Sequence, residues 1–309
     1  MSARDPKTMG AVDLSDKMCF YCIGAQKTGS SWLHQYLGQL PDVYTPPVKE
    51  LHYFDTRHLA RLNGRAHSGW LAAQASKLSR RVLVLTERLG QAEDETLKAE
   101  IAEELKCRAK LLEALHVPEA YREILTGNLG EATVFGETTP AYALLDRKAF
   151  EEMAGLFPNT RFIFVMRDPV DRLWSQMRMR TQRREVAGLS DHEAEARAVA
   201  RFEEALTKRD GWARSDYKHT IEQLSGVVPD GDVLFLFYET MFTEDVIRQV
   251  CDFLGVSYQP ARFSEKVHGG RAQPLPADLA SRARAVMADV YDFIEGRFGD
   301  AVPTSWRQA

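Results

Sequence analysis

The stretch Gly24-Ala-Gln-Lys-Thr-Gly-Ser-Ser31 decides the fold, because it joins an apolar run to an amphipathic one. Before it, Cys19–Ile23 is apolar at every position, as in a buried strand. After it, Ser30–Leu40 carries its large apolar residues on one helical stripe. Two glycines separated by four residues suit a turn whose backbone N–H groups, with the helix N-terminus, bind a phosphate-like anion. The stretch predicts an anion-binding turn between a strand and a helix.

The rest of the chain repeats this alternation of strand and helix. Three more apolar runs have the length of strands, and their consecutive apolar positions are typical of a parallel sheet covered on both faces. Helical patterns with capping signals follow, so we expect an α/β fold with a central parallel sheet. The predicted strands are Val134–Gly136, Phe162–Met166 and Val233–Tyr238; the predicted helices are Pro169–Thr181, Ser190–Leu206 and Thr243–Leu254.

Composition limits the function classes. The chain has 309 residues and a net charge of −4, so bulk charge attracts neither nucleic acid nor an anionic membrane. No run approaches the ~20 apolar residues of a membrane span. We expect a cytoplasmic protein with an N-terminal tail over 1–17 and a single domain over 18–309, which carries a helical insertion at about 58–126.

The four cysteines are too few for a disulfide scaffold. Cys19 and Cys22 form a C-x-x-C, but on a strand that spacing places the two thiols on opposite faces. We therefore expect buried thiols and no metal site.

A second anion site is predicted at Arg167, where the apolar run Phe162–Met166 ends. Ligands of open α/β sheets bind at this edge. Ser175 follows about two helical turns later and can face the same edge. The alternative is that Arg167 pairs with Asp168 or Asp171 and only caps the helix.

This arrangement of two anion sites on one sheet edge resembles that of the sulfotransferase family that uses 3′-phosphoadenosine 5′-phosphosulfate (PAPS). Gln26–Trp32 is similar to that family's 5′-phosphosulfate loop, and Arg167–Ser175 is similar to its 3′-phosphate motif. Phe235–Met241, with the following helix ending at Gly255, resembles a third family segment. The resemblance extends from about Cys19 to about Arg297 and excludes the insertion. The motifs are most similar to those of bacterial and heparan-sulfate-type members. It implies a three-layer P-loop-like fold.

The resemblance also implies roles in donor binding. Lys27 would stabilise the charge on the departing 5′-phosphate oxygen during in-line transfer. Trp32 and Tyr238 would contact adenine, although a core aromatic is the alternative for Trp32. Arg167 and Ser175 would hold the 3′-phosphate, while Glu265–Arg271 departs from the family's lysine-rich donor loop. The donor-binding residues implied are Gln26, Lys27, Thr28, Gly29, Ser30, Ser31, Trp32, Arg167, Ser175, Tyr238, Gly269, Gly270 and Arg271.

The acceptor side is implied by Val48–Asp55, which resembles a Lys-Glu-x-His-Phe-Phe segment of the family. Glu50 maps to the catalytic base there, with His52 as the substitute. Neighbouring lysines would keep the pKa of Glu50 low, so its strength as a base must come from positioning. The acceptor-binding residues implied are Lys49, Glu50, Thr139 and Tyr142.

Two other functions remain as alternatives. A P-loop kinase or NTPase is disfavoured because Ser30 stands where the G-x-x-x-x-G-K-[ST] motif has its lysine. A non-catalytic nucleotide-binding protein on the same fold is disfavoured by the presence of both Lys27 and Glu50. Sugar, lipid, polyketide and small-alcohol acceptors all stay open, and the sequence leaves the oligomeric state open as well.

Overall fold

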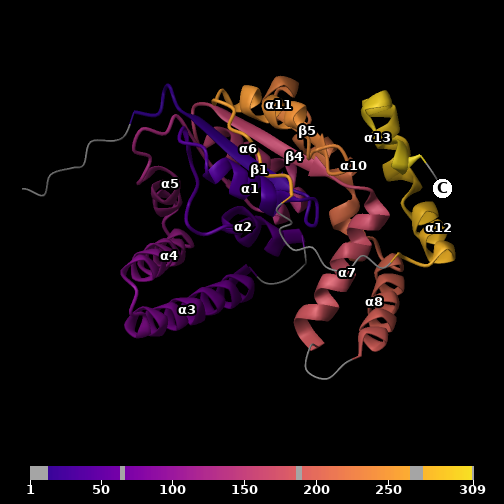
Figure 1. The fold of residues 1–309 in the computed structure, drawn as a ribbon, viewed down its shortest axis with the longest axis horizontal. Coiled ribbons are helices and arrows are strands. Elements are labelled where there is room, and N and C mark those ends of the chain that lie inside the picture. The colour runs from indigo at the N-terminus through magenta and orange to yellow at the C-terminus, as the bar shows by residue number, and fades with distance from the viewer. Residues whose placement is uncertain (1–12, 63–66, 186–189, 265–273, 308–309) are drawn as a thin grey trace, which may run out of the picture.

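The structure, a computed structural model, describes residues 13–62, 67–185, 190–264 and 274–307. At its centre is a parallel sheet of five strands in the order β2-β3-β1-β4-β5 (Figure 1). The expected strands are confirmed, and β2 adds a two-residue edge strand too short to show in an apolar pattern. The strands are β1 Met18–Gly24, β2 Val43–Tyr44, β3 Val134–Thr138, β4 Thr160–Met166 and β5 Val233–Phe237.

Helices cover both faces of this sheet and make three layers. Side chains of β1 alternate between two separate apolar clusters, with Tyr21 in one and Phe20 in the other. The cluster around Phe20 lies under α1 (Ser30–Gly38) and α11 (Glu244–Leu254). The other faces α5 (Pro118–Thr126), α6 (Arg147–Gly155) and α10 (Tyr217–Leu224), among others. The predicted α/β fold class is confirmed.

The helix boundaries follow the predicted capping signals. Ser190 caps α8 (Asp191–Leu206) in a capping box with Glu193. Thr243 caps α11, which ends at Gly255 in a left-handed conformation. The helix α7 spans Pro169–Glu185, four residues beyond its expected end. The remaining elements are η1 Pro140–Leu144, α9 Arg209–Trp212, η2 Ala213–Ser215, η3 Asp230–Asp232, α12 Ala277–Val286, α13 Ala288–Phe298, η4 Gly299–Ala301 and η5 Thr304–Trp306.

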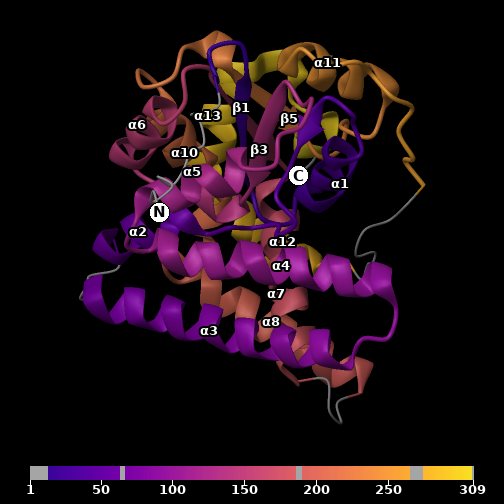
Figure 2. The ribbon, with the colours of Figure 1, turned by 90° about the vertical axis from the view of Figure 1, so that its left-hand side faces the viewer.

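The expected insertion is helical, beginning with α2 (Tyr53–Leu62) and ending with α5. Its two long helices, α3 (His67–Gln91) and α4 (Glu95–Ala114), run side by side below the sheet in Figure 2. The buried face of α4 consists of Ile101, Cys107, Leu111 and Ala114, while Leu97 is 40% exposed.

All four cysteines are buried and free, and Cys19 and Cys22 lie in the clusters on opposite faces of the sheet, as predicted. Among the described residues, no three His, Cys, Asp or Glu side chains gather as metal ligands would. In the same part of the chain, every helix is too short or too polar to cross a membrane.

Candidate active site

The turn after β1 is the predicted anion-binding loop. Gly29 precedes α1 with φ 81°, and a Cβ there would lie 2.9 Å from Met241 Cε, so the position requires glycine. The Thr28 hydroxyl donates to the carbonyl of Ala25 at 2.6 Å, and the Ala25 N–H donates to Val165 at 2.7 Å. These bonds fix the loop on the ends of β1 and β4.

Arg167, at the end of β4, lies against this loop. Its guanidinium donates to the carbonyl of Lys27 at 3.4 Å and lies over the ring of Tyr238 at 4.7 Å. Asp168 instead caps α7 through the N–H groups of Val170 and Asp171, at 2.9 and 3.0 Å. Within the described residues Arg167 pairs with neither aspartate, so the alternative of a mere helix cap is not what the structure has.

Two other predicted donor residues are partly or fully buried. Ser175 is half-buried on α7, on the helix that Asp168 caps. Trp32 is only 7% exposed and packs near-parallel to both Tyr36 and Phe263, with ring centroids 5.8 and 5.7 Å apart. In this conformation Trp32 is part of an aromatic cluster, which is the alternative stated for it above. Gly269, Gly270 and Arg271 lie outside the described residues.

Glu50 and His52 form a charged pair on the segment between β2 and α2. The Lys49 ammonium lies 2.7 Å from one Glu50 oxygen, and His52 Nε2 lies 3.6 Å from the other. His52 Nδ1 is 2.8 Å from Asp55. Burial alone raises the pKa of Glu50, but His52 and Lys49 outweigh it and lower that pKa to about 2. Burial lowers the pKa of His52, yet Asp55 and Glu50 raise it to about 9.

A buried carboxylate, Glu137, holds that segment in place. It is the residue before the last of β3 and accepts hydrogen bonds from the Tyr121, Thr139 and Tyr142 hydroxyls at 2.5, 2.6 and 2.8 Å, and from the Leu51 N–H at 3.3 Å. Tyr142 in turn accepts from the N–H of Tyr53 at 3.1 Å. Thr139 and Tyr142 are fully buried, so neither side chain presents surface to an acceptor in this structure.

Glu137 is not among the residues expected from the sequence, although Thr139 and Tyr142, which donate to it, are. The available signal was a carboxylate at the end of an otherwise apolar strand, next to three residues with side-chain hydroxyls. A buried carboxylate must be hydrogen-bonded, so such a placement indicates an internal network.

Buried arginines behind the loop were also not foreseen. Arg172 is fully buried, and its guanidinium bonds only neutral groups among the described residues: Ser215 Oγ at 2.6 Å, Gln176 Oε1 at 2.9 Å and the Gln26 carbonyl at 3.5 Å. Its Nη2 has no hydrogen-bond partner in the part of the chain that the structure describes. Burial lowers the pKa of Arg172 to about 9, and burial also lowers that of Arg214 nearby. Buried charges are normally paired, so a fully buried guanidinium with neutral partners in the described residues is unusual.

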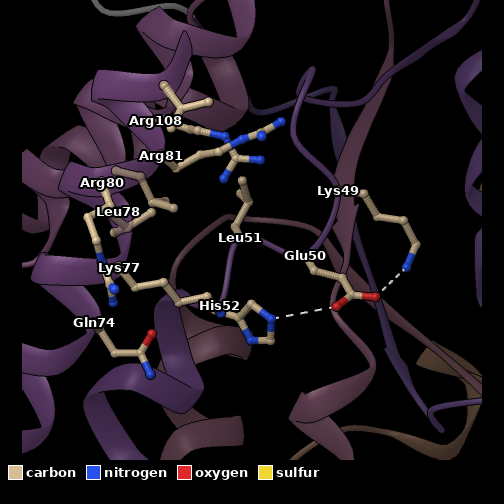
Figure 3. A pocket seen from close by; sticks show the side chains of 12 residues that line it. Lys49, Glu50, Leu51, His52, Gln74, Lys77, Leu78, Arg80, Arg81 and Arg108 are labelled. Carbon is tan, nitrogen blue, oxygen red and sulfur yellow. Dashed lines mark hydrogen bonds and ion pairs between the residues drawn. The ribbon is translucent and has the colours of Figure 1, made fainter. Parts of the chain in front are cut away.

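A cavity of about 590 Å³ opens beside Glu50 (Figure 3). One wall is the segment Lys49–His52 and the other is built by α3 and α4. The helical insertion therefore shapes the space next to the predicted base. The lining residues are Lys49, Glu50, Leu51, His52, Gln74, Lys77, Leu78, Arg80, Arg81, Val84, Arg108 and Leu111.

The fold and this edge define a P-loop-like α/β protein with an anion loop, a neighbouring arginine and a carboxylate facing a cavity. A model of the sulfotransferase family matches residues 20–260, and the chain belongs to that family. Family members in general take their sulfuryl group from PAPS, and the chain is a sulfotransferase of this type. The predicted enzyme class is confirmed over the kinase alternative.

One solved sulfotransferase structure shares the fold, and others were matched more weakly. A sulfotransferase from Alicyclobacillus acidocaldarius superimposes with a TM-score of 0.59 at 22% identity, covering 94% of this chain and 98% of that one. The sulfotransferase domain of the Synechococcus PCC 7002 olefin synthase matches at 19% identity, with a TM-score of 0.48 and coverage of 96% and 100%. A search of curated proteins found no match.

Proposed function

We propose that the chain binds PAPS along the sheet edge formed by the ends of β3, β1 and β4, and transfers its sulfuryl group to an acceptor hydroxyl in the cavity beside Glu50. The observation that carries the proposal is the order of the strand ends. The loop with Lys27 follows β1, Arg167 ends β4, and the Glu50 N–H donates to Thr138 of β3 at 3.2 Å. Because β1 lies between β3 and β4, the three groups share one edge.

The residues present fit the donor. The 24–31 loop and the N-terminus of α1 supply N–H groups for the phosphosulfate, and Arg167 supplies a cation for the 3′-phosphate. The unpartnered Nη2 of Arg172 adds a buried donor behind the loop. We assign the contacts with the 5′ end to Gln26, Thr28, Gly29, Ser30 and Ser31, a 3′-phosphate contact to Ser175, and the adenine contacts to Trp32 and Tyr238. For its contact Trp32 has to leave the aromatic cluster with Tyr36 and Phe263.

When bound, the donor supplies an electrophilic sulfur with adenosine 3′,5′-bisphosphate as its leaving group. Glu50 accepts the proton of the acceptor hydroxyl as that oxygen bonds to sulfur and the sulfur–phosphate oxygen bond breaks. Lys27 stabilises the charge that develops on the departing phosphate oxygen. With a pKa of about 2, Glu50 is ionised and acts through its position rather than its basicity. His52, with a pKa of about 9, carries a proton at neutral pH and positions Glu50.

The donor half is tested by calorimetric titration with adenosine 3′,5′-bisphosphate, without metal, on wild type, Arg167→Ala and Arg88→Ala. Arg88 is an exposed arginine at the far end of α3 and serves as the matched control. We expect wild type and the control to bind equally, and Arg167→Ala to bind about tenfold to a hundredfold more weakly, as for a lost charge-assisted hydrogen bond. A preference for ATP with Mg²⁺ would contradict the proposal.

A further inference from the structure

We propose that the acceptor is an anionic hydroxyl compound, whose carboxylate, sulfate or phosphate group is bound by Lys77 and Arg80 of α3 while its hydroxyl faces Glu50. The inference rests on the proposed function, because Glu50 serves as the acceptor's base. It adds the substrate class, which neither the family nor the fold assigns.

The charge of the cavity wall carries the inference. Five lysine and arginine side chains line the cavity, against Glu50 as the carboxylate among the described lining residues. This excess of cations is local, because the whole chain has a net charge of −4. In Figure 3, Lys77, Arg80, Arg81 and Arg108 come from the α3–α4 side, and Lys49 and His52 from the opposite side. His52 is already paired with Asp55 at 2.8 Å and with Glu50 at 3.6 Å, so the excess of positive charge comes from the lysines and arginines.

Not all of these cations are available. Glu104 lies 3.1 Å from Arg81 and 2.8 Å from Arg108, so one carboxylate serves two guanidinium groups. Lys49 is paired with Glu50. Arg80 Nε donates to the Ser76 carbonyl at 3.4 Å, and the described residues offer no carboxylate partner to Arg80 or Lys77. These two side chains lie one helical turn apart on the exposed face of α3 and can bind one anion together.

The same wall also presents apolar surface. Leu51, Leu78, Val84 and Leu111 lie among the charged side chains, and Gln74 adds a neutral hydrogen-bonding group. A volume of about 590 Å³ suits a molecule of drug size. The chemistry therefore fits a compact acceptor with an apolar or ring body, one hydroxyl and an anionic group at a distance from it.

The test uses matched alcohol pairs that differ only in charge: a nitrophenyl β-glucuronide and the β-glucoside, hydroxymethylbenzoate and its amide, hydroxydodecanoate and its amide. Each probe is titrated calorimetrically into the complex with adenosine 3′,5′-bisphosphate, and sulfation from PAPS is then measured. In at least one pair we expect the anionic member to bind about tenfold more tightly, and Lys77→Gln/Arg80→Gln to remove that difference.

The control variant Arg88→Gln/Lys106→Gln loses the same two charges from exposed positions that do not line the cavity, and should keep the preference. Two outcomes would overturn the inference. In the first, no pair shows tighter binding of its anionic member, which includes the case that no probe binds. In the second, Lys77→Gln/Arg80→Gln keeps the preference for the anionic member. Binding of adenosine 3′,5′-bisphosphate should be equal in all variants. If wild type fails to bind that nucleotide, the proposed function fails, and titration of the same pairs into the free protein still decides the inference.

Discussion

Lys27, Glu50 and His52 are the non-glycine residues with positive φ in the described chain, at 74°, 61° and 57°. They are also the three residues that the sequence indicated as catalytic. A left-handed conformation costs a residue with a Cβ about 1–2 kcal/mol, so it persists only where the surroundings enforce it. The agreement supports the proposed site independently of the motif resemblance, because neither φ nor strain entered the sequence argument.

The opposite pKa shifts of Glu50 and His52 predict how stability depends on pH. The pKa of His52 is raised from 6.5 to about 9, so its contribution is complete below pH 6.5 and is lost as pH rises through about 9. The pKa of Glu50 is lowered from 4.5 to about 2, so its contribution is present above pH 4.5 and is lost as pH falls through about 2. The pair therefore stabilises the fold most between about pH 4.5 and 6.5.

We expect His52→Gln to remove the alkaline part of this dependence. Between pH 6.5 and 9 wild type should lose about 1 kcal/mol that the variant does not lose, a value reduced because the His52 side chain is 36% exposed. Urea unfolding at several pH values measures it. Parallel curves for the two proteins would show that folding does not raise the pKa of His52.

At the scale of elements, residues at the end of β3 hold the segment that carries Glu50 and His52, and the end of β1 carries the loop with Lys27. Glu137 reaches the Leu51 N–H directly and the Tyr53 N–H through Tyr142. Glu137→Gln keeps the volume but replaces one acceptor oxygen with an NH2 donor. We expect a loss of about 1–3 kcal/mol and faster hydrogen exchange at Leu51 and Tyr53.

Tyr44→Phe is the control for Glu137→Gln, since it removes a hydroxyl that donates to the Ile124 carbonyl at 3.4 Å on the edge strand. Its exchange at Leu51 and Tyr53 should equal that of wild type. Unchanged exchange in Glu137→Gln would mean that the network does not position the segment with Glu50.

The anion loop depends on one glycine. At Gly29, alanine would hold φ 81° and bring its Cβ to 2.9 Å from Met241 Cε and 3.2 Å from Phe242 Cζ. We expect Gly29→Ala to cost about 1–3 kcal/mol and to weaken adenosine 3′,5′-bisphosphate binding. Gly296→Ala in α13, where no atom lies within 4 Å of the added Cβ, should instead be neutral or stabilising. Thermal unfolding of both variants checks the contrast.

Strands and caps were predictable because their signals are local. Consecutive apolar residues mark β1 and β4, and Ser190, Thr243 and Gly255 mark helix ends. The cavity was not predictable, because Lys77 and Arg80 line the same cavity as Glu50 only through the tertiary packing of α3. The burial of Arg172 was not predictable either, because its sequence context is that of an ordinary exposed helix start.

On the scale of the whole molecule, a buried cation beside the loop predicts a coupling between donor binding and stability. We expect Arg172, fully buried without a carboxylate among the described residues, to destabilise the protein until an anion binds. An anion at the loop offsets this cost, so ligand binding should stabilise the fold both by mass action and by relieving the uncompensated charge.

Arg172→Met tests this coupling, because methionine keeps most of the volume and removes the charge. Without ligand we expect the variant to unfold within about 1 kcal/mol of wild type, or at higher temperature, since apolar replacement of a buried charge is often neutral or stabilising. With saturating adenosine 3′,5′-bisphosphate its gain in Tm should be smaller, and its affinity about tenfold weaker. Thermal unfolding with and without the nucleotide measures both. A variant that is strongly destabilised alone, yet gains as much from the nucleotide as wild type, would show that Arg172 holds the fold through Ser215 and Gln176 and does not act on the anion.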